Sequence, residues 1–204
     1  MVVPAGIGPF IIVLAGPNGA GKSTFYELFL DGIPVPFVNA DRIAKTLRRA
    51  PGAADYEAAK IAEAERRRLV AERQSFVMET VFSDPAGDKV GFLRRARDAG
   101  YFVALAYIGL DNPGLAAARV AHRVRNGGHT VVPERVAARY DRSLANLRNA
   151  LGFVDHAWLY DNSAVPFRRV AETARGSVVM QVPKLPTWAA GVLPEESDSP
   201  RRKA

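Results

Sequence analysis

The 204-residue sequence contains no cysteine and only three histidines. The lack of cysteine excludes disulfide bonds, cysteine-ligated zinc and thiol catalysis, and it is typical of a cytoplasmic protein. No apolar run reaches the roughly 18 residues of a membrane-spanning helix. The first eight residues carry no positive side chain, so they do not resemble a signal peptide. We therefore expect a cytoplasmic protein that does not contact a membrane.

The composition that remains is ordinary for one globular domain. Hydrophobic residues make up 48% of the chain and charged residues 24%. The length suffices for one domain with a sizeable core, but not comfortably for two. We expect residues 1–9 to be a flexible arm and residues 10–193 to form the single domain. Residues 194–204 are mostly polar and charged, and we expect a disordered tail there.

The stretch from residue 10 to residue 24 is the feature around which the chain is organised. Its first part, FIIVL, is apolar and rich in β-branched residues, which is typical of a strand buried on both faces of a parallel sheet. Its second part, GPNGAGKS, fits the phosphate-binding pattern G-x-x-x-x-G-K-[ST]. The glycines allow a tight turn whose N–H groups point at an anion, and the following helix adds the positive end of its dipole. We expect nucleotide phosphates to be bound by Gly16, Pro17, Asn18, Gly19, Ala20, Gly21, Lys22, Ser23 and Thr24.

Two side chains of this motif carry more specific expectations. Lys22 is placed to reach the β- and γ-phosphates of a nucleotide, and the Ser23 hydroxyl is placed to ligate Mg²⁺. A glycine-rich turn that matches the pattern by accident is the alternative, but the strand before the motif and the helix after it argue against that alternative. We expect this helix to have Phe25, Leu28 and Phe29 as its apolar side.

Polar residues also stand where the next predicted strand ends. Asn39 and Asp41 follow a short strand at 34–38 and open a helix at 42–49. In an open α/β sheet, ligands bind at the carboxyl ends of the strands. Asp41 is therefore either a plain helix N-cap or an acid that faces the γ-phosphate. In the second case it could accept the proton of an attacking hydroxyl or bind Mg²⁺ indirectly.

Two further acidic positions follow predicted strands. Glu79 and Thr80 come directly after the strand predicted at 75–78, and a solvated loop is the alternative interpretation of this pair. Asp111 comes three residues after the strand predicted at 101–108. It resembles the acid of a Walker B motif, but we interpret it as part of a helix cap.

The remaining elements follow from apolar periodicity and from turn residues. We interpret a long charged helix at 53–73 as scaffold, with a thin apolar stripe formed by Ala58, Ile61, Ala62 and Leu69. The other predicted elements are a helix from Ser83 to Ala99, strands at 101–108 and 153–160, and a hairpin with strands at 167–173 and 177–182.

Positive charge is concentrated between residues 119 and 148. Seven arginines stand there against two acidic residues, which gives a net charge of +5. Two predicted helices, at 115–125 and from about residue 132 to residue 151, are joined by the break NGGH at 126–129. We predict that these two helices form a lid over phosphates, at about residues 115–148. The alternative is that they form a solvated basic surface. The candidate phosphate contacts are Arg119, Arg123, Arg139 and Arg142, and His129 is either a further contact or a surface residue.

Taken together, these segments resemble the zeta toxin family of small-molecule kinases. The matching segments are LAGPNGAGKST, FVNAD, SFVMET, the basic segment 119–147 and YDNS, which span roughly residues 10–163 in this order. The resemblance implies an α/β fold of the P-loop kinase type, with a parallel sheet, helices on both faces and a helical, arginine-rich lid. It also implies transfer of the γ-phosphate of ATP, with Mg²⁺, to a hydroxyl of a UDP-activated amino sugar. The typical acceptor is the 3′-hydroxyl of UDP-N-acetylglucosamine.

The resemblance further implies roles for individual residues and a partner. Asp41 matches the acid that accepts the hydroxyl proton, and Lys22 and Ser23 match the phosphate and metal residues. The substrate pocket would be formed by Asn39, Asp41, Glu79 and Thr80, and catalysis would involve Asp41, Lys22, Arg119, Arg123, Arg139 and Arg142. Of the four arginines, we expect Arg123 and Arg139 to contact the γ-phosphate. The family name implies a neutralising antitoxin as a protein partner.

Other functions stay open, because the acceptor is the least specific part of the resemblance. The chain is short and its GGH segment belongs to a compact branch, so the nearest alternative is a P-loop kinase for an antibiotic, a sugar acid or a nucleoside. A nucleic-acid-dependent ATPase or polynucleotide kinase is less favoured, because the basic segment contains one aromatic residue, Tyr140, and no stacking platform. The third alternative is a non-catalytic nucleotide switch. The sequence has no N-K-x-D motif, which argues against a GTPase.

Overall fold

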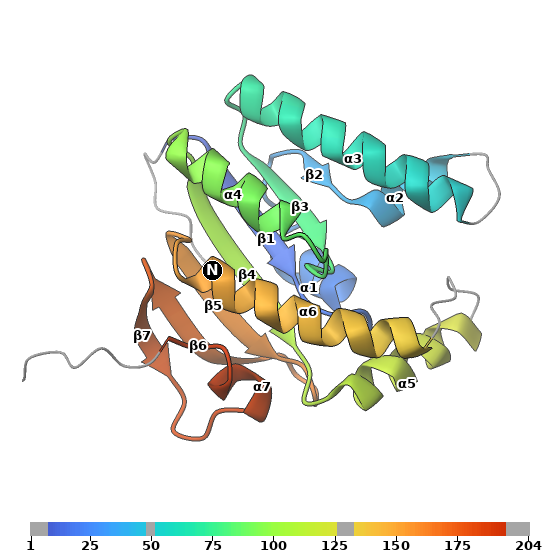
Figure 1. The fold of residues 1–204 in the computed structure, drawn as a ribbon, viewed down its shortest axis with the longest axis vertical. Helices are drawn as coiled ribbons and strands as arrows, with labels where there is room; N and C mark the ends of the chain where they lie inside the picture. Colours follow the sequence, from blue (N-terminus) through green and yellow to red (C-terminus); the bar gives the residue numbers. More distant parts are fainter. Residues whose placement is uncertain (1–7, 48–51, 126–132, 195–204) are drawn as a thin grey trace, which may run out of the picture.

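In the computed structural model, which describes residues 8–47, 52–125 and 133–194, the strand before the glycine-rich loop lies inside a seven-stranded sheet. The order of the strands is β2-β3-β1-β4-β5-β6-β7 (Figure 1). Strands β1 to β5 are parallel, whereas β6 and β7 extend the sheet as an antiparallel hairpin. The strands are β1 (Phe10–Ala15), β2 (Phe37–Val38), β3 (Phe76–Thr80), β4 (Phe102–Gly109), β5 (His156–Asp161), β6 (Arg168–Ala174) and β7 (Ser177–Gln181).

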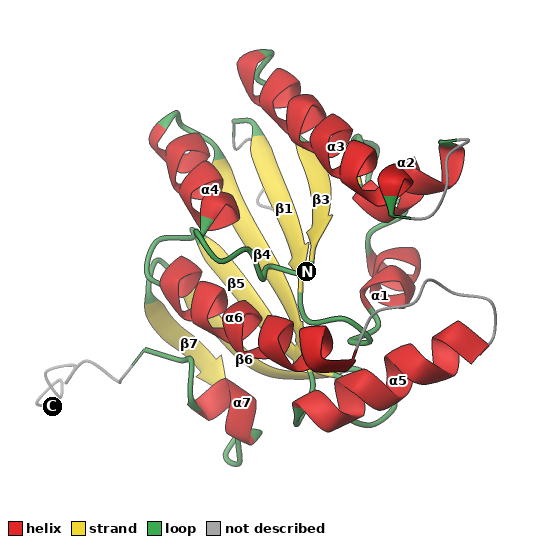
Figure 2. Ribbon diagram, turned by 45° about the vertical axis from the view of Figure 1, so that its right-hand side comes forward, coloured by secondary structure: helices red, strands yellow, loops and turns green. Residues whose placement is uncertain are grey.

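Helices cover both faces of this sheet (Figure 2). Ile11 and Val13 of β1 pack in one core with α3, α4 and α6, whereas Ile12 and Leu14 pack in a second core with α1 and α5. Because both faces are covered, residues 11–15 are all buried, which explains the continuous apolar run. The helices are α1 (Lys22–Phe29), α2 (Ala40–Thr46), α3 (Ala53–Ala71), α4 (Asp88–Asp98), α5 (Pro113–Arg125), α6 (Pro133–Leu151) and α7 (Thr187–Ala190).

The predicted fold class is confirmed, and most predicted elements occur near their expected bounds. The strand of the glycine-rich motif, the two arginine-bearing helices and the terminal hairpin are present. The strands expected at 34–38 and 153–160 are shorter, at β2 and β5, and α7 was not predicted. None of the described helices is long and apolar enough to cross a lipid bilayer. Residues 1–7 of the expected arm, residues 195–204 of the expected tail and the NGGH break lie outside the described residues.

The helix that was expected to begin at Ser83 begins at Asp88 instead. The preceding residues 82–87 form a loop, which α6 holds from far along the chain. Asn146 donates hydrogen bonds from Nδ2 to the backbone carbonyl oxygens of Phe82 (3.0 Å) and Asp84 (3.1 Å). The local sequence predicts a helix start at Ser83, but the hydrogen bonds from Asn146 keep this segment in a loop.

The apolar side of α1 also differs from the prediction. Leu28 and Phe29 are 63% and 55% exposed, whereas Phe25 and Tyr26 are buried. The side chain of Lys22 turns back to the glycine-rich loop and is buried. Lys22, Phe25 and Tyr26 lie on one helix face, which turns inward. Phe29 stays at the rim of this face, where its ring contacts those of Phe25 and Phe167.

The register of the sheet brings the polar strand ends together. Leu14 of β1 pairs with Glu79 of β3, and Val38 of β2 pairs with Met78 of β3. Because these strands are parallel, the loop after β1, the segment after β2 and the end of β3 meet at one edge of the sheet. This edge is where ligands bind in open α/β sheets.

Candidate active site

The loop between β1 and α1 has the backbone shape of a phosphate-binding loop. Gly16 and Gly21 have φ values of +146° and +90°, which residues with a side chain rarely adopt. A Cβ atom on Gly16 would lie 2.3 Å from the carbonyl oxygen of Ile108, and one on Gly21 would lie 2.6 Å from Nδ2 of Asn162. Asn162 also donates from Nδ2 to the carbonyl oxygen of Ala20 (2.8 Å). The neighbouring strand ends therefore hold the loop so closely that only glycine fits at these two positions.

Lys22 is the buried cation of this loop, with 7% of its side chain exposed. Its ammonium group donates hydrogen bonds to the carbonyl oxygens of Gly16 (2.9 Å) and Pro17 (3.2 Å). Nζ also lies 3.9 Å from Oε1 of Glu79. Burial lowers the pKa of Lys22, and the carboxylates of Glu79 and Asp41 oppose that shift. The cation thus faces a set of oxygen atoms that favours its protonated form.

Glu79 links the ends of neighbouring strands. Its Oε2 accepts a hydrogen bond from Nδ2 of Asn39 (2.7 Å), while its Oε1 faces Lys22. Burial raises the pKa of Glu79, and the positive charge of Lys22 opposes that shift. The interpretation of Glu79 and Thr80 as a solvated loop is wrong, because β3 extends to Thr80 and the side chain of Glu79 is only 10% exposed.

The cap of α2 is Asn39 rather than Asp41. Oδ1 of Asn39 accepts a hydrogen bond from the backbone N–H of Arg42 (3.0 Å), which is the contact of an N-cap. Asp41 lies in the first turn of α2, and its side chain is exposed. Its carboxylate is therefore not used for capping and can meet a ligand.

Two cavities meet at this edge of the sheet. The loop cavity, of about 220 Å³, lies over the glycine-rich loop, and the large cavity, of about 450 Å³, lies beside it. Asp41, Glu79 and Val81 line both, so they mark the boundary. The other residues of the loop cavity are Asn18, Gly19, Gly21, Lys22, Ser23, Thr24, Arg119 and Arg123. The large cavity is further lined by Asn39, Ala40, Ala59, Ala62, Arg66, Thr80, Phe82, Ser83, Asp84, Pro85, Lys89, Arg139 and Arg142.

The four candidate arginines divide between these cavities. Arg119 and Arg123 of α5 line the loop cavity, whereas Arg139 and Arg142 of α6 line the large cavity. Arg119 and Arg142 each donate to a backbone carbonyl oxygen, at 3.3 Å and 2.9 Å. No hydrogen bond or ion pair joins Arg123 or Arg139 to another described residue, so their guanidinium groups are available to a ligand. His129, the further candidate, lies outside the described residues.

Four residues of this region have a place at the site that their sequence positions did not predict. Asn162 holds the glycine-rich loop, and Arg66, Asp84 and Lys89 line the large cavity. A signal for Arg66 was present, because it stands four and eight residues after the buried Ala62 and Ala58 and so belongs to the buried face of α3. Asp84 and Lys89 had been assigned to a regular helix, which hid the loop that brings them to the cavity.

The chain is similar to a known protein family and to several known proteins. A family model described as zeta toxin matches residues 3–169. An uncharacterised protein of Haemophilus influenzae is 29% identical over 130 residues, which are 63% of this chain and 91% of that protein. A structure of the PezAT chromosomal toxin–antitoxin system of Streptococcus pneumoniae gives a TM-score of 0.58 at 17% identity, over 81% of this chain and 71% of that chain.

The AvrRxo1-ORF1:-ORF2 complex with ATP gives a TM-score of 0.56 at 14% identity, over 86% of this chain and 61% of that chain. These structural likenesses show a shared fold, which is that of P-loop kinase-like proteins. The family match covers most of the chain, including the glycine-rich loop, both cavities and both arginine-bearing helices. The protein therefore belongs to the zeta toxin family.

Proposed function

We propose that this protein is a kinase that transfers the γ-phosphate of ATP to a hydroxyl group of a UDP-activated amino sugar similar to UDP-N-acetylglucosamine. The observation that carries the proposal is the boundary between the loop cavity and the large cavity, which Asp41 and Glu79 both line. A nucleotide over the glycine-rich loop and an acceptor in the large cavity would meet at these two carboxyl groups. Membership of the zeta toxin family supports the same assignment.

The loop cavity fits the phosphates of ATP. Lys22, Arg119 and Arg123 supply positive charge beside the glycine-rich loop. The fold is shared with the AvrRxo1-ORF1:-ORF2 complex, whose structure contains ATP. We therefore assign the segment Gly16–Thr24 to nucleotide binding.

The same cavity fits Mg²⁺ as an ion that accompanies the nucleotide. The described residues contain no group of three or more His, Cys, Asp or Glu side chains that could hold a metal ion by themselves. Mg²⁺ is commonly bound by substrate phosphates, water and only one or two protein groups. The exposed hydroxyl of Ser23 in the first turn of α1 is the protein ligand that fits this role. When bound, Mg²⁺ neutralises charge on the β- and γ-phosphates.

Asp41 is the proposed base. Its carboxylate accepts the proton of the acceptor hydroxyl while the bond between that oxygen and the γ-phosphorus forms and the bond to the bridging β–γ oxygen breaks. Lys22 holds the phosphates, and Arg123 and Arg139 neutralise the charge that develops during transfer, an effect on the order of 10³–10⁵ in rate. Closure of the segment at about residues 115–148 would exclude water from the site.

The large cavity is the proposed acceptor site. Its volume of about 450 Å³ is within the usual range for small-molecule pockets. Asn39, Glu79 and Thr80 line it next to Asp41 and offer polar contacts for a sugar. The resemblance to the family motifs supports a UDP-amino sugar as the acceptor. The fold shared with the PezAT toxin–antitoxin structure supports a neutralising antitoxin as a protein partner.

A coupled assay of ADP release, with and without UDP-N-acetylglucosamine, tests this proposal. We expect strong stimulation by the sugar nucleotide, and mass analysis should find one added phosphate on it. If ATP binds but UDP-N-acetylglucosamine does not stimulate ADP release, the proposed acceptor is wrong. An acceptor screen that includes sugar acids, antibiotics, nucleosides and nucleic acid would then follow.

A further inference from the structure

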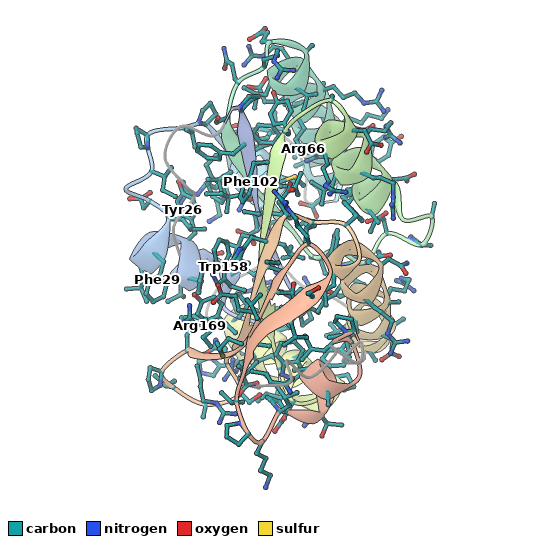
Figure 3. The ribbon with its side chains drawn as sticks, turned by 90° about the vertical axis from the view of Figure 1, so that its left-hand side faces the viewer. Tyr26, Phe29, Arg66, Phe102, Trp158 and Arg169 are labelled. Carbon is teal, nitrogen blue, oxygen red and sulfur yellow. The ribbon has the colours of Figure 1, made fainter. Side chains whose placement is uncertain are left out.

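Arg66 is a charged side chain inside the helix layer. Only 8% of it is exposed, and it belongs to the face of α3 that also buries Ala58 and Ala62. Figure 3 shows it on the opposite side of the sheet from Tyr26 and Phe29 of α1. Alanines on this face leave room in front of α3, and the large cavity occupies that room.

No described residue pairs with the guanidinium group of Arg66. It has no hydrogen bond or ion pair within the described residues, whereas its exposed neighbours Arg67 and Arg68 pair with glutamates one turn away. Burial lowers the pKa of Arg66, although Glu63 and Asp84 oppose the shift. An arginine nevertheless stays protonated at neutral pH. Buried charges are normally paired or bound to a ligand, so we expect the guanidinium group of Arg66 to bind an anion.

Arg66 stands at the end of the large cavity that is away from the proposed reaction. Arg66 and Lys89 also line an outer cavity of about 320 Å³, together with Glu63, Arg67, Asp88, Phe92 and Arg95. Asp41 and Glu79, in contrast, line the boundary with the loop cavity. The large cavity therefore has a carboxyl end next to the nucleotide site and a basic end that continues into the outer cavity.

A second unsatisfied group lies in the same cavity. Oδ1 of Asp84 is buried without a hydrogen-bond partner, while Oδ2 accepts a hydrogen bond from the backbone N–H of Lys89 (3.2 Å). Asp84 forms no ion pair with Arg66. A donor and an acceptor thus face the large cavity, and neither is satisfied by the part of the protein that the structure describes.

We propose that Arg66, together with Lys89, binds a phosphate group of the acceptor, at the opposite end of the large cavity from Asp41. A guanidinium group offers a planar fork of donors that matches two phosphate oxygens, and a lysine ammonium adds a point charge. Oδ1 of Asp84 accepts a hydrogen bond from a hydroxyl or amide next to that phosphate. This inference rests on the proposed function, because it assigns the charged part of the acceptor, which in a UDP-sugar is the diphosphate.

A binding measurement tests the site without any assumption about the acceptor. The protein is first saturated with Mg²⁺ and a non-hydrolysable ATP analogue, so that the loop cavity is filled, and is then titrated with inorganic phosphate at constant ionic strength. We expect saturable binding that Arg66→Gln weakens about 10- to 100-fold, which is the size of a charge-assisted hydrogen bond. Arg68→Gln, on the exposed face of the same helix, should bind phosphate like the wild type. Equal affinity of wild type and Arg66→Gln, or no saturable binding to either, would overturn the proposal.

A kinetic measurement then separates binding of the acceptor's phosphate from a structural role. For Arg66→Gln, we expect KM for UDP-N-acetylglucosamine to rise about 10- to 100-fold with little change in kcat, and Arg66→Lys should restore part of the loss. N-acetylglucosamine lacks the diphosphate, so its kcat/KM should not depend on Arg66. Equal losses with both acceptors would show that Arg66 is structural. If the wild type phosphorylates neither acceptor, the proposed function fails, and the phosphate titration alone decides about Arg66.

Thermal unfolding distinguishes a binding role of Arg66 from a structural role, because the two roles predict opposite changes in Tm when Arg66 is replaced. A buried unpaired charge destabilises a ligand-free protein, and apolar replacements of buried ions are often neutral or stabilising. Arg66→Met should therefore keep or raise Tm without ligand. With the loop cavity filled by Mg²⁺ and the non-hydrolysable ATP analogue, added phosphate should raise Tm of the wild type only. A lower Tm of ligand-free Arg66→Met would contradict the assignment of Arg66 as a binding residue.

Discussion

Replacement of Glu79 by glutamine tests how the site holds Lys22 before ATP binds. The change keeps the side-chain shape and an oxygen that can accept the hydrogen bond from Nδ2 of Asn39, but it removes the negative charge 3.9 Å from Nζ of Lys22. Two unit charges about 4 Å apart interact with about 4 kcal/mol at an effective dielectric constant of about 20. The hydrogen bonds of Lys22 to Gly16 and Pro17 remain. Since burial already lowers the pKa of Lys22 and Glu79 opposes this most strongly, the substitution should lower that pKa further.

The effect on ATP binding should change sign with pH. At the low end of the pH range, where Lys22 keeps its proton, the variant lacks a carboxylate that repels phosphates and competes for the ammonium group. The variant should therefore bind ATP at least as tightly as the wild type. At higher pH, Lys22 of the variant loses its proton first, so the ATP affinity of the variant should begin to fall at a lower pH than that of the wild type.

Calorimetric titration with a non-hydrolysable ATP analogue between about pH 6 and pH 10 measures both effects. Glu65→Gln is the matched control, because it removes the same charge from an exposed carboxylate that pairs with Arg68. This control should follow the wild type at every pH. Parallel profiles of wild type and Glu79→Gln would refute the conclusion that Glu79 maintains the charge of Lys22.

Three further predictions concern the arginines and the loop. Arg123→Ala and Arg139→Ala should each lower kcat at least about 100-fold, with KM changing less, and steady-state kinetics with wild-type kcat in both would show that the two side chains only decorate the surface. Gly21→Ala should weaken ATP binding and cost about 1–3 kcal/mol in the free energy of unfolding, because the position has a φ of +90° and a new Cβ would meet Asn162. In denaturant unfolding, the double variant Gly21→Ala/Asn162→Ala should lose less stability than the sum of the two single variants, and full additivity of the two changes would contradict the clash.

The part of the site that local chemistry determines could be predicted from the sequence. The glycine-rich motif fixes the loop, and the rule that ligands bind at the carboxyl ends of parallel strands places Asn39, Asp41 and Glu79 near it. The structure confirms that these residues meet at one edge of the sheet. The choice between a cap and a free carboxylate at Asp41 depends on which side chain turns to the N–H of Arg42, and the sequence alone does not show that Asn39 does so.

The part that depends on tertiary contacts could not be predicted. A long charged helix suggests a solvated face and predicts a scaffold role for Arg66, although the structure buries this side chain in the wall of the large cavity. The loop at 82–87 carries a helix-start signal, which Asn146 of α6 overrides by binding its backbone carbonyl oxygens. The buried face of α1 also depends on packing, because Tyr26 turns inward while the more apolar Leu28 and Phe29 are largely exposed.

The most direct test of the central claim compares wild type with Asp41→Asn. Acceptor-dependent release of ADP and the affinity for ATP are measured on the same preparations. If Asp41 is the base at the boundary of the two cavities, the substitution should leave ATP affinity unchanged and lower phosphoryl transfer to the acceptor by about 10²–10⁴-fold. Turnover of Asp41→Asn within about tenfold of the wild type would contradict the account.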